Sequence, residues 1–444
     1  MKKAEKPILR LLNSLYKYAL AALLIFIPLY PKFPLFSLPY TYVAIRAEDF
    51  FIAFTFGLLL LKLITERKLK LPSITPQIGI FFFVGLVSGL SAILVTKNVQ
   101  PLLVLLHFFR RVEYILAFFM VYYAAREAKN RYFYLELILL PVIGVFIYGL
   151  AQLYFEAPVI STMDSEASKG VALILRPGVT LSSTFAGHYD LAVYLSMIMI
   201  FLSSISASIN SWLKRAPFIA GFAALMWLFM QTGSRISLAG LVLSVMLVTY
   251  LYRQFLLGAV LLTIIGIGVA TSPALLVRFQ SILNIFTSEA TELIAPSVYA
   301  QTPTPTPTAL PTPPPEPLRP IQEDRSTSIR FDVEWPRAIR SFLKNPLFGT
   351  GYSSLTLATD NDYLRALGET GLLGLLAFIS VILGLYKSLR HRLNKTGYDK
   401  VIVVSSLGVL LFFLVTAVFL DVFEASKIAI LFWAVMGLAI SQKA

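Results

Sequence analysis

Long apolar stretches recur along the whole chain and are separated by short polar segments. A helix needs about 17 to 25 mostly apolar residues to cross a bilayer, and the stretches have this length. They are centred near residues 23, 56, 86, 115, 143, 197, 222, 244, 263, 378, 411 and 432. The one near 115 is expected to start at the charged residues Arg110, Arg111 and Glu113. The pattern predicts an all-α integral membrane protein with about twelve transmembrane helices.

One long polar interruption divides these stretches. Residues 272–367 predict an external loop between an N-terminal membrane domain, 1–271 with about nine spans, and a C-terminal one, 368–444 with about three. Its Pro- and Thr-rich tract, 301–317, cannot build a packed core, so we expect an extended tether; a glycosylated stalk is the alternative. The following stretch, SIRFDVEWPRAIRSFLKNPLFGTGYSSL, predicts an amphipathic helix on the outer membrane surface.

Composition and charge agree with a membrane protein. Hydrophobic residues make up 57% of the chain and charged residues only 14%, against about 25% in soluble domains. The net charge of +14 comes from Lys and Arg in alternate short loops, such as 387–400, which favours cytoplasmic N- and C-termini and argues against a nucleic-acid partner. The chain has no cysteine and shows no metal-ligand spacing, so we predict neither a metal nor a cofactor.

Four polar segments fall on the outward face in this topology, which suggests one shared site: residues 176–188, residues 234–235, residues 330–340 on the loop helix, and residues 360–369. Arginine binds phosphate oxygens in pairs and keeps its proton, while a carboxylate can deprotonate a hydroxyl. The predicted phosphate-binding residues are Arg235, Arg330, Arg176 and Arg337. The predicted catalytic residues are Asp360, Glu369 and His188. Two further residues are predicted to position the acceptor or the loop, Asn361 and Tyr363.

Structural explanations exist for each of these residues. A single outward arginine can anchor a helix at the interface by extending its side chain towards water. Asp360 and Asp362 can pair with Arg330, Arg337 or Arg365 merely to fold the loop. His188 can be a hydrogen-bonded interfacial residue. Arg235 fits the anchoring explanation less well, because it opens an apolar helix, where an arginine is costly without an anionic partner.

Several motifs follow one another in a characteristic order. They are AIRAEDFFIAF, RPGVTLSSTFAGHYDLAVYL, QTGSRISLAGL, IRFDVEWPRAI, NPLFGTGYSSL and DNDYLRALGETGLLGLLAF. With this order and spacing, the chain resembles the O-antigen ligase and polymerase superfamily. These membrane glycosyltransferases move glycans from a polyprenyl-diphosphate carrier.

The resemblance implies an activity and roles for some residues. The donor would be a glycan on undecaprenyl diphosphate and the acceptor a hydroxyl of a lipid, a protein or another glycan, at the outer face of a prokaryotic cytoplasmic membrane. Ser234-Arg235 matches the family's Ser-Arg pair, and Arg330 before Trp335 matches its loop arginine; both arginines are implicated in holding the diphosphate. The family usually has a His-Asn pair before Tyr-Leu, with the His as base. Here Asp360 stands in the place of that His, and a metal-independent inverting transfer is expected.

The residues alone leave two other functions open. One is a transporter or flippase for polysaccharide or lipid-linked glycan, although the chain shows no inverted repeat and its charged groups gather at one face rather than mid-membrane. The other is a non-catalytic membrane partner in cell-surface glycan assembly, which the missing family His keeps possible. Turnover of a lipid-diphosphate donor by the purified protein would separate the three.

Overall fold

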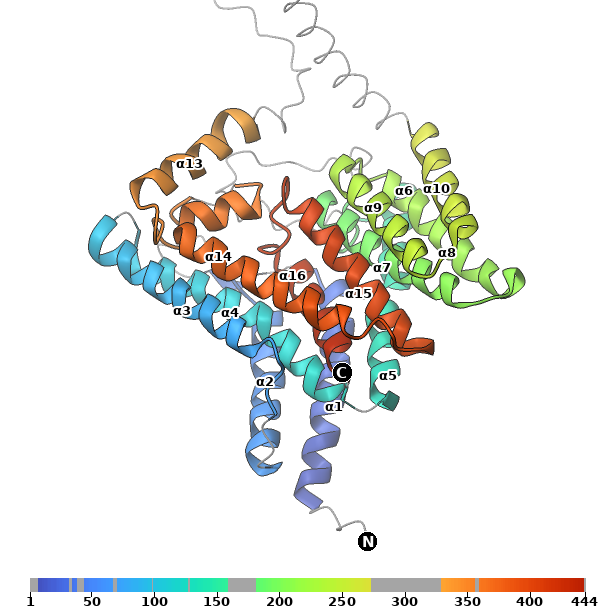
Figure 1. Ribbon diagram of the computed structural model, residues 1–444, viewed down its shortest axis with the longest axis horizontal. Helices are drawn as coiled ribbons and strands as arrows, with labels where there is room; N and C mark the ends of the chain where they lie inside the picture. Colours follow the sequence, from blue (N-terminus) through green and yellow to red (C-terminus); the bar gives the residue numbers. More distant parts are fainter. Residues whose placement is uncertain are drawn as a thin grey trace, which may run out of the picture.

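A computed structural model describes residues 7–31, 34–37, 44–66, 70–97, 99–126, 128–158, 181–272, 329–355 and 359–442. Within these ranges the protein is a bundle of helices with one small pair of strands (Figure 1). The Pro- and Thr-rich tract, most of the predicted external loop and Arg176 lie outside the described residues.

The chain up to Ala270 supplies ten α-helices, one π-helical turn and both strands of the described part. They are α1 Pro7–Leu29, β1 Pro34–Ser37, β2 Ala44–Arg46, α2 Ala47–Glu66, α3 Thr75–Ser91 with the π-helical turn η1 Ala92–Thr96, α4 Pro101–Ala124, α5 Ala128–Leu139, α6 Val142–Tyr154, α7 His188–Ser208, α8 Trp212–Met230, α9 Arg235–Leu251 and α10 Phe255–Ala270. The two strands pair antiparallel before α2. The last part supplies η3 Ile329–Glu334, α13 Trp335–Lys344, α14 Asp362–Arg390, α15 Gly397–Thr416 and α16 Ser426–Ile440.

Each of the twelve predicted span centres falls within a helix of the structure. Seven helical stretches of the described residues are long and apolar enough to cross a membrane, one of them combining α5 and α6. The shorter apolar helices α9, α10 and α16 accompany them. The all-α membrane architecture is therefore confirmed. Twelve crossings stay a prediction, because α2 carries charged residues near both ends, α4 carries them in its interior, and three of the helices are short.

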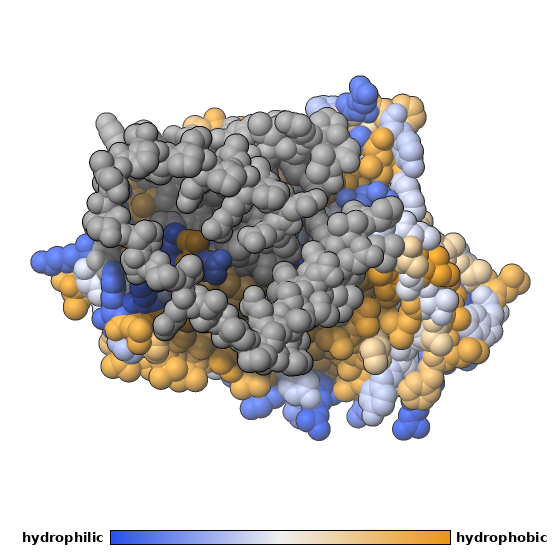
Figure 2. Space-filling view, turned by 90° about the horizontal axis from the view of Figure 1, so that it is seen from above, coloured by the Kyte–Doolittle hydropathy of each residue, from blue (hydrophilic) through white to orange (hydrophobic). Residues whose placement is uncertain are grey.

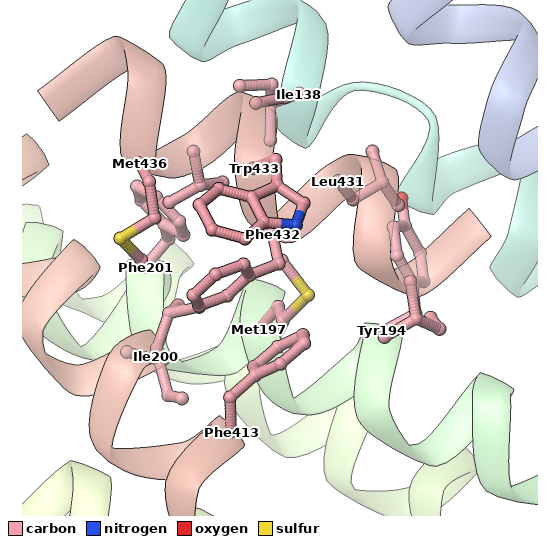
Figure 3. Close-up of a cluster of buried hydrophobic side chains, with 14 of the residues drawn as sticks. Ile138, Tyr194, Met197, Ile200, Phe201, Phe413, Leu431, Phe432, Trp433 and Met436 are labelled. Carbon is pink, nitrogen blue, oxygen red and sulfur yellow. The ribbon is translucent and has the colours of Figure 1, made fainter. Parts of the chain in front are cut away.

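Helix α16 lies at the centre of the bundle. All fifteen of its residues are buried, and it packs against α4, α15 and α7. Aromatic side chains fill this contact, with the rings of Phe413 and Phe432 4.5 Å apart and that of Trp433 5.3 Å from Phe432. Figure 3 shows these rings meeting Met197 and Phe201 of α7. Helices with no polar face are expected only deep inside a protein or in a membrane.

The periphery of the bundle is apolar as well. Large hydrophobic side chains are exposed on the surrounding helices, among them Ile64, Phe83 and Leu213. In the view of Figure 2, hydrophobic residues cover much of the visible rim. Such a surface is unfavourable in water but suits contact with lipid chains.

Helix α14 has a kink at Gly371 that shapes the site described below. Gly371 has φ +68° and ψ −168°, a conformation that favours glycine, and the turn Asn345–Gly351 packs into the resulting gap. The amides of Thr350 and Gly351 donate to the carbonyls of Gly368 and Glu369 at 3.0 and 2.8 Å. The turn therefore takes up carbonyls that the kink leaves without helical partners.

Candidate functional site

Arg330 and Asp360 form an ion pair between the loop helix region and the start of α14. The guanidinium Nε and Nη2 of Arg330 donate to Oδ2 of Asp360 at 3.1 and 2.7 Å. No described residue donates to the second oxygen, Oδ1, and a quarter of the Asp360 side chain is exposed. One carboxylate oxygen is thus held, while the other is accessible.

Two residues beside Arg330 fix the backbone of Asp360. The indole Nε1 of Trp335 donates to its carbonyl at 2.9 Å, and its amide donates to Oε2 of Glu334 at 2.9 Å. Burial first, and then the charge of Asp360, raise the pKa of Glu334 above its ordinary value. Glu334 is not among the site residues predicted from the sequence.

The start of α7 adds aromatic rings to this pair. The ring of Tyr189 lies 5.8 Å from the guanidinium carbon of Arg330 and 4.0 Å from the ring of His188. Tyr189 therefore lies close both to Arg330 of the pair and to His188. The structure brings together three of the four segments that the sequence predicted to converge: the start of α7, the loop helix region and the start of α14.

The other predicted residues take different positions. Arg235 begins α9 and is half-buried, and Arg337 in α13 is half-buried as well. Within the described residues, neither arginine is a hydrogen-bond partner of Asp360, which Arg330 contacts. Asn361 caps α14, because its Oδ1 accepts from the amide of Leu364 at 2.9 Å. Tyr363 donates its hydroxyl to the carbonyl of Leu414 at 2.8 Å, which anchors α14 to α15.

Glu369 lies in a separate and more buried charged network. Nη2 of Arg111 donates to Glu369 at 2.8 Å and lies 2.8 Å from Glu424. Arg365 lies 3.6 Å from Glu369 and 3.8 Å from Asp421. We call these five residues the buried network, in which Asp421 lies at the edge with its side chain 26% exposed, and Arg330 with Asp360 the loop pair. Burial raises the pKa of Glu424, although Arg111 and Arg365 oppose this.

The buried network borders a small cavity of about 60 Å³. Tyr352 closes one side, with its ring 4.0 Å from the guanidinium carbon of Arg111, and the amide of Ser353 donates to Glu369 at 3.1 Å. The cavity has room for a few water molecules, so it is too small for a sugar. Buried charges are tolerated in this position because each has a partner of opposite sign.

Arg111 is a residue that the sequence reasoning missed. The sequence placed Arg111 with Arg110 and Glu113 at the start of a span centred near 115 and gave it no role in a site, whereas α4 begins at Pro101 and carries Arg111 in its interior. Ionisable residues within an apolar helix mark a buried partner, and this signal was present in the sequence. Glu424 could not be assigned in the same way, because its partner lies more than 300 residues away.

Residues 219–379 match a family model described as O-antigen ligase. The chain carries an O-antigen ligase domain. The resemblance to the O-antigen ligase and polymerase superfamily is thereby confirmed, and no curated protein matched the chain. The ligase domain begins within α8 and ends within α14, so it includes Arg235, the loop pair and Glu369. Arg111, Tyr189 and Glu424 approach it from outside.

No group of three or more His, Asp or Glu side chains within the described residues is arranged to hold a metal ion. Positive charge near the loop pair comes from arginine.

Proposed function

We propose that the protein is a glycosyltransferase that moves a glycan from undecaprenyl diphosphate to an acceptor hydroxyl at the outer face of the cytoplasmic membrane. Three features support this: the O-antigen ligase domain, the apolar helical bundle, and the loop pair. The loop pair carries the proposal, because it places an arginine suited to phosphate beside a carboxylate with one accessible oxygen.

In this mechanism Arg330 binds the diphosphate of the donor, and Arg235, Arg176 and Arg337 add positive charge around it. The guanidinium of Arg330 is at first shared with Oδ2 of Asp360. A bound diphosphate competes for that guanidinium. Asp360 then becomes the stronger base, because it loses part of the positive charge that stabilised its ionised form.

The transfer proceeds as a single displacement. The acceptor oxygen forms a bond to the anomeric carbon while its proton passes to Asp360. The bond between the anomeric carbon and the phosphate oxygen breaks, and its electron pair leaves with undecaprenyl diphosphate. Arginines stabilise the charge that develops on the leaving group. Glu369 and His188 are the alternative bases. The hydrogen bonds of Glu369 to Arg111 and to the Ser353 amide make it the weaker candidate.

The test uses the purified full chain in nanodiscs, with an undecaprenyl-diphosphate-linked glycan and a hydroxyl acceptor. We expect one undecaprenyl diphosphate released for each glycan transferred. Movement of unmodified donor across the bilayer without transfer would indicate a flippase. Neither activity, in protein that is monodisperse and binds donor, would indicate a non-catalytic partner. The surface glycans of a deletion strain then separate a ligase, whose loss prevents attachment, from a polymerase, whose loss shortens chains.

A further inference from the structure

A second and larger cavity lies at the opposite end of α14 from the loop pair. It measures about 520 Å³ and lies among the start of α3, the end of α4, the end of α14 and the end of α16. Its size falls within the range of small-molecule sites, about 300 to 1,000 Å³. It shares no lining residue with the cavity of the buried network.

The charge of this second cavity is one-sided. Arg126, Lys387 and Arg392 contribute to its lining together with His391, and no Asp or Glu does. Arg392 is held in place, because its Nε and Nη2 donate to the carbonyls of Gln442 and Ile440 at 3.0 and 3.3 Å. Arg126 and Lys387, which also line the cavity, are exposed residues. Within the described residues, no carboxylate forms an ion pair with either side chain.

Unmatched hydrogen-bond acceptors complete the lining. Gln442 is only 2% exposed, and its Oε1 has no donor in the described part of the chain. The orientation of this amide is fixed, because its Nε2 donates to the carbonyl of Asp399 at 3.0 Å. Oε1 of Gln77, on α3, is also buried and without a donor. A buried acceptor without a donor is costly, so two around one cavity point to a ligand that supplies donors.

We propose that this cavity binds a phosphate-bearing group with hydrogen-bond donors beside the phosphate, as in a phosphatidylglycerol headgroup or in soluble glycerol phosphate. Arg126 and Lys387 bind the phosphate oxygens by charge-assisted hydrogen bonds. The glycerol hydroxyls donate to Gln77 and Gln442. The site goes beyond the proposed transfer, because it lies away from the loop pair and has no carboxylate that could act as a base.

The test compares two double variants of the full chain, purified without lipid in a neutral maltoside detergent. Arg126→Ala/Lys387→Ala removes the two exposed cations of the cavity. Lys129→Ala/Lys214→Ala removes the same charge from exposed positions that do not line it. Phosphatidylglycerol is titrated while the melting temperature is recorded. We expect half-saturation to require about tenfold more lipid in the cavity variant, which corresponds to about 1.4 kcal/mol, and to be unchanged in the control variant.

Two other probes identify the ligand's chemistry and source. Phosphatidylcholine, which has no donor on its headgroup, should stabilise the protein only weakly. Soluble glycerol 1-phosphate, if it saturates the site with the same dependence on Arg126 and Lys387, would support the site and identify a soluble ligand. The proposal fails if phosphatidylcholine stabilises as well as phosphatidylglycerol. It also fails if the cavity variant binds phosphatidylglycerol like the wild type. These outcomes leave the glycan-transfer assay unaffected, so the two proposals can fail separately.

Discussion

The loop pair and the buried network use the same residue types in opposite ways. In the loop pair, one arginine meets one carboxylate whose side chain is a quarter exposed. In the buried network, Arg111 and Arg365 are surrounded by three carboxylates, and the side chain of Glu369 is only 1% exposed. Removing a charge from water is costly unless partners replace the lost hydration, so the buried network is committed to holding helices together. The loop pair can exchange a partner for a ligand.

This difference assigns a stabilising role to Glu369 within α14 and a catalytic role to Asp360 just before α14. Glu369 and Asp360 are nine residues apart, and both were candidate bases in the sequence. Only Asp360 keeps an accessible oxygen. Three substitutions and one deletion break or sharpen the comparison, in order of decreasing effect.

The largest effect is expected for Arg111→Met. It leaves Glu369 and Glu424 without their shared cation, and breaking a buried pair costs about 3 to 5 kcal/mol, a large part of a typical total stability of about 5 to 15 kcal/mol. We expect a sharp fall in melting temperature and in the yield of monodisperse protein. The combined variant Arg111→Met/Glu369→Gln/Glu424→Gln should recover much of the loss. A stable Arg111→Met protein would contradict a stabilising role for the network.

Asp360→Asn should act on turnover rather than on folding. Loss of a general base lowers the rate by about a hundred- to ten-thousandfold, while donor affinity should be retained because the arginines remain. Rates and donor binding are measured in nanodiscs. The matched control is Glu334→Gln, which keeps an oxygen to accept the Asp360 amide and should stay within about tenfold of the wild type. Normal turnover by Asp360→Asn would move the base to His188 or Glu369.

Arg235→Lys tests whether the proposed diphosphate site extends to α9. Lysine keeps the charge but loses the planar fork that binds two phosphate oxygens, so we expect turnover to fall about ten- to hundredfold and donor binding to weaken. Arg235→Ala should lose more. If Arg235→Ala binds donor as tightly as the wild type, the diphosphate site is confined to the loop pair.

The smallest effect is expected from shortening the Pro- and Thr-rich tract, which lies outside the described residues. It has no side chain suited to phosphate binding or acid–base chemistry, and loop-closure entropy changes slowly with length. Deletion of residues 302–313 should leave turnover within about tenfold, or about 1.4 kcal/mol in the barrier. Complete loss of activity in protein that still reaches the membrane would assign the tract a direct role.

Hydrophobic periodicity located the helices well but described charged ones poorly. The centre predicted near 197 falls in α7, which is almost wholly buried, and the one near 432 falls in α16. The pattern could not distinguish helices that face lipid from helices enclosed by protein, because both are apolar. In α4 the arginines and Glu113 were placed at the start of the span, whereas the helix begins about ten residues earlier.

For the site, too, some features follow from the sequence and others only from the tertiary structure. The sequence by itself determined the residue types, the order of the motifs and the O-antigen ligase domain, because these depend on local composition and spacing. Only the tertiary structure decided that Arg330 pairs with Asp360, that Glu369 pairs with Arg111, and that Asn361 caps α14. Arg111 and Glu369 are 258 positions apart, and no local pattern specifies which distant charge a buried carboxylate meets. Burial and partner choice arise from packing, and they decide which carboxylate keeps an oxygen accessible to a substrate.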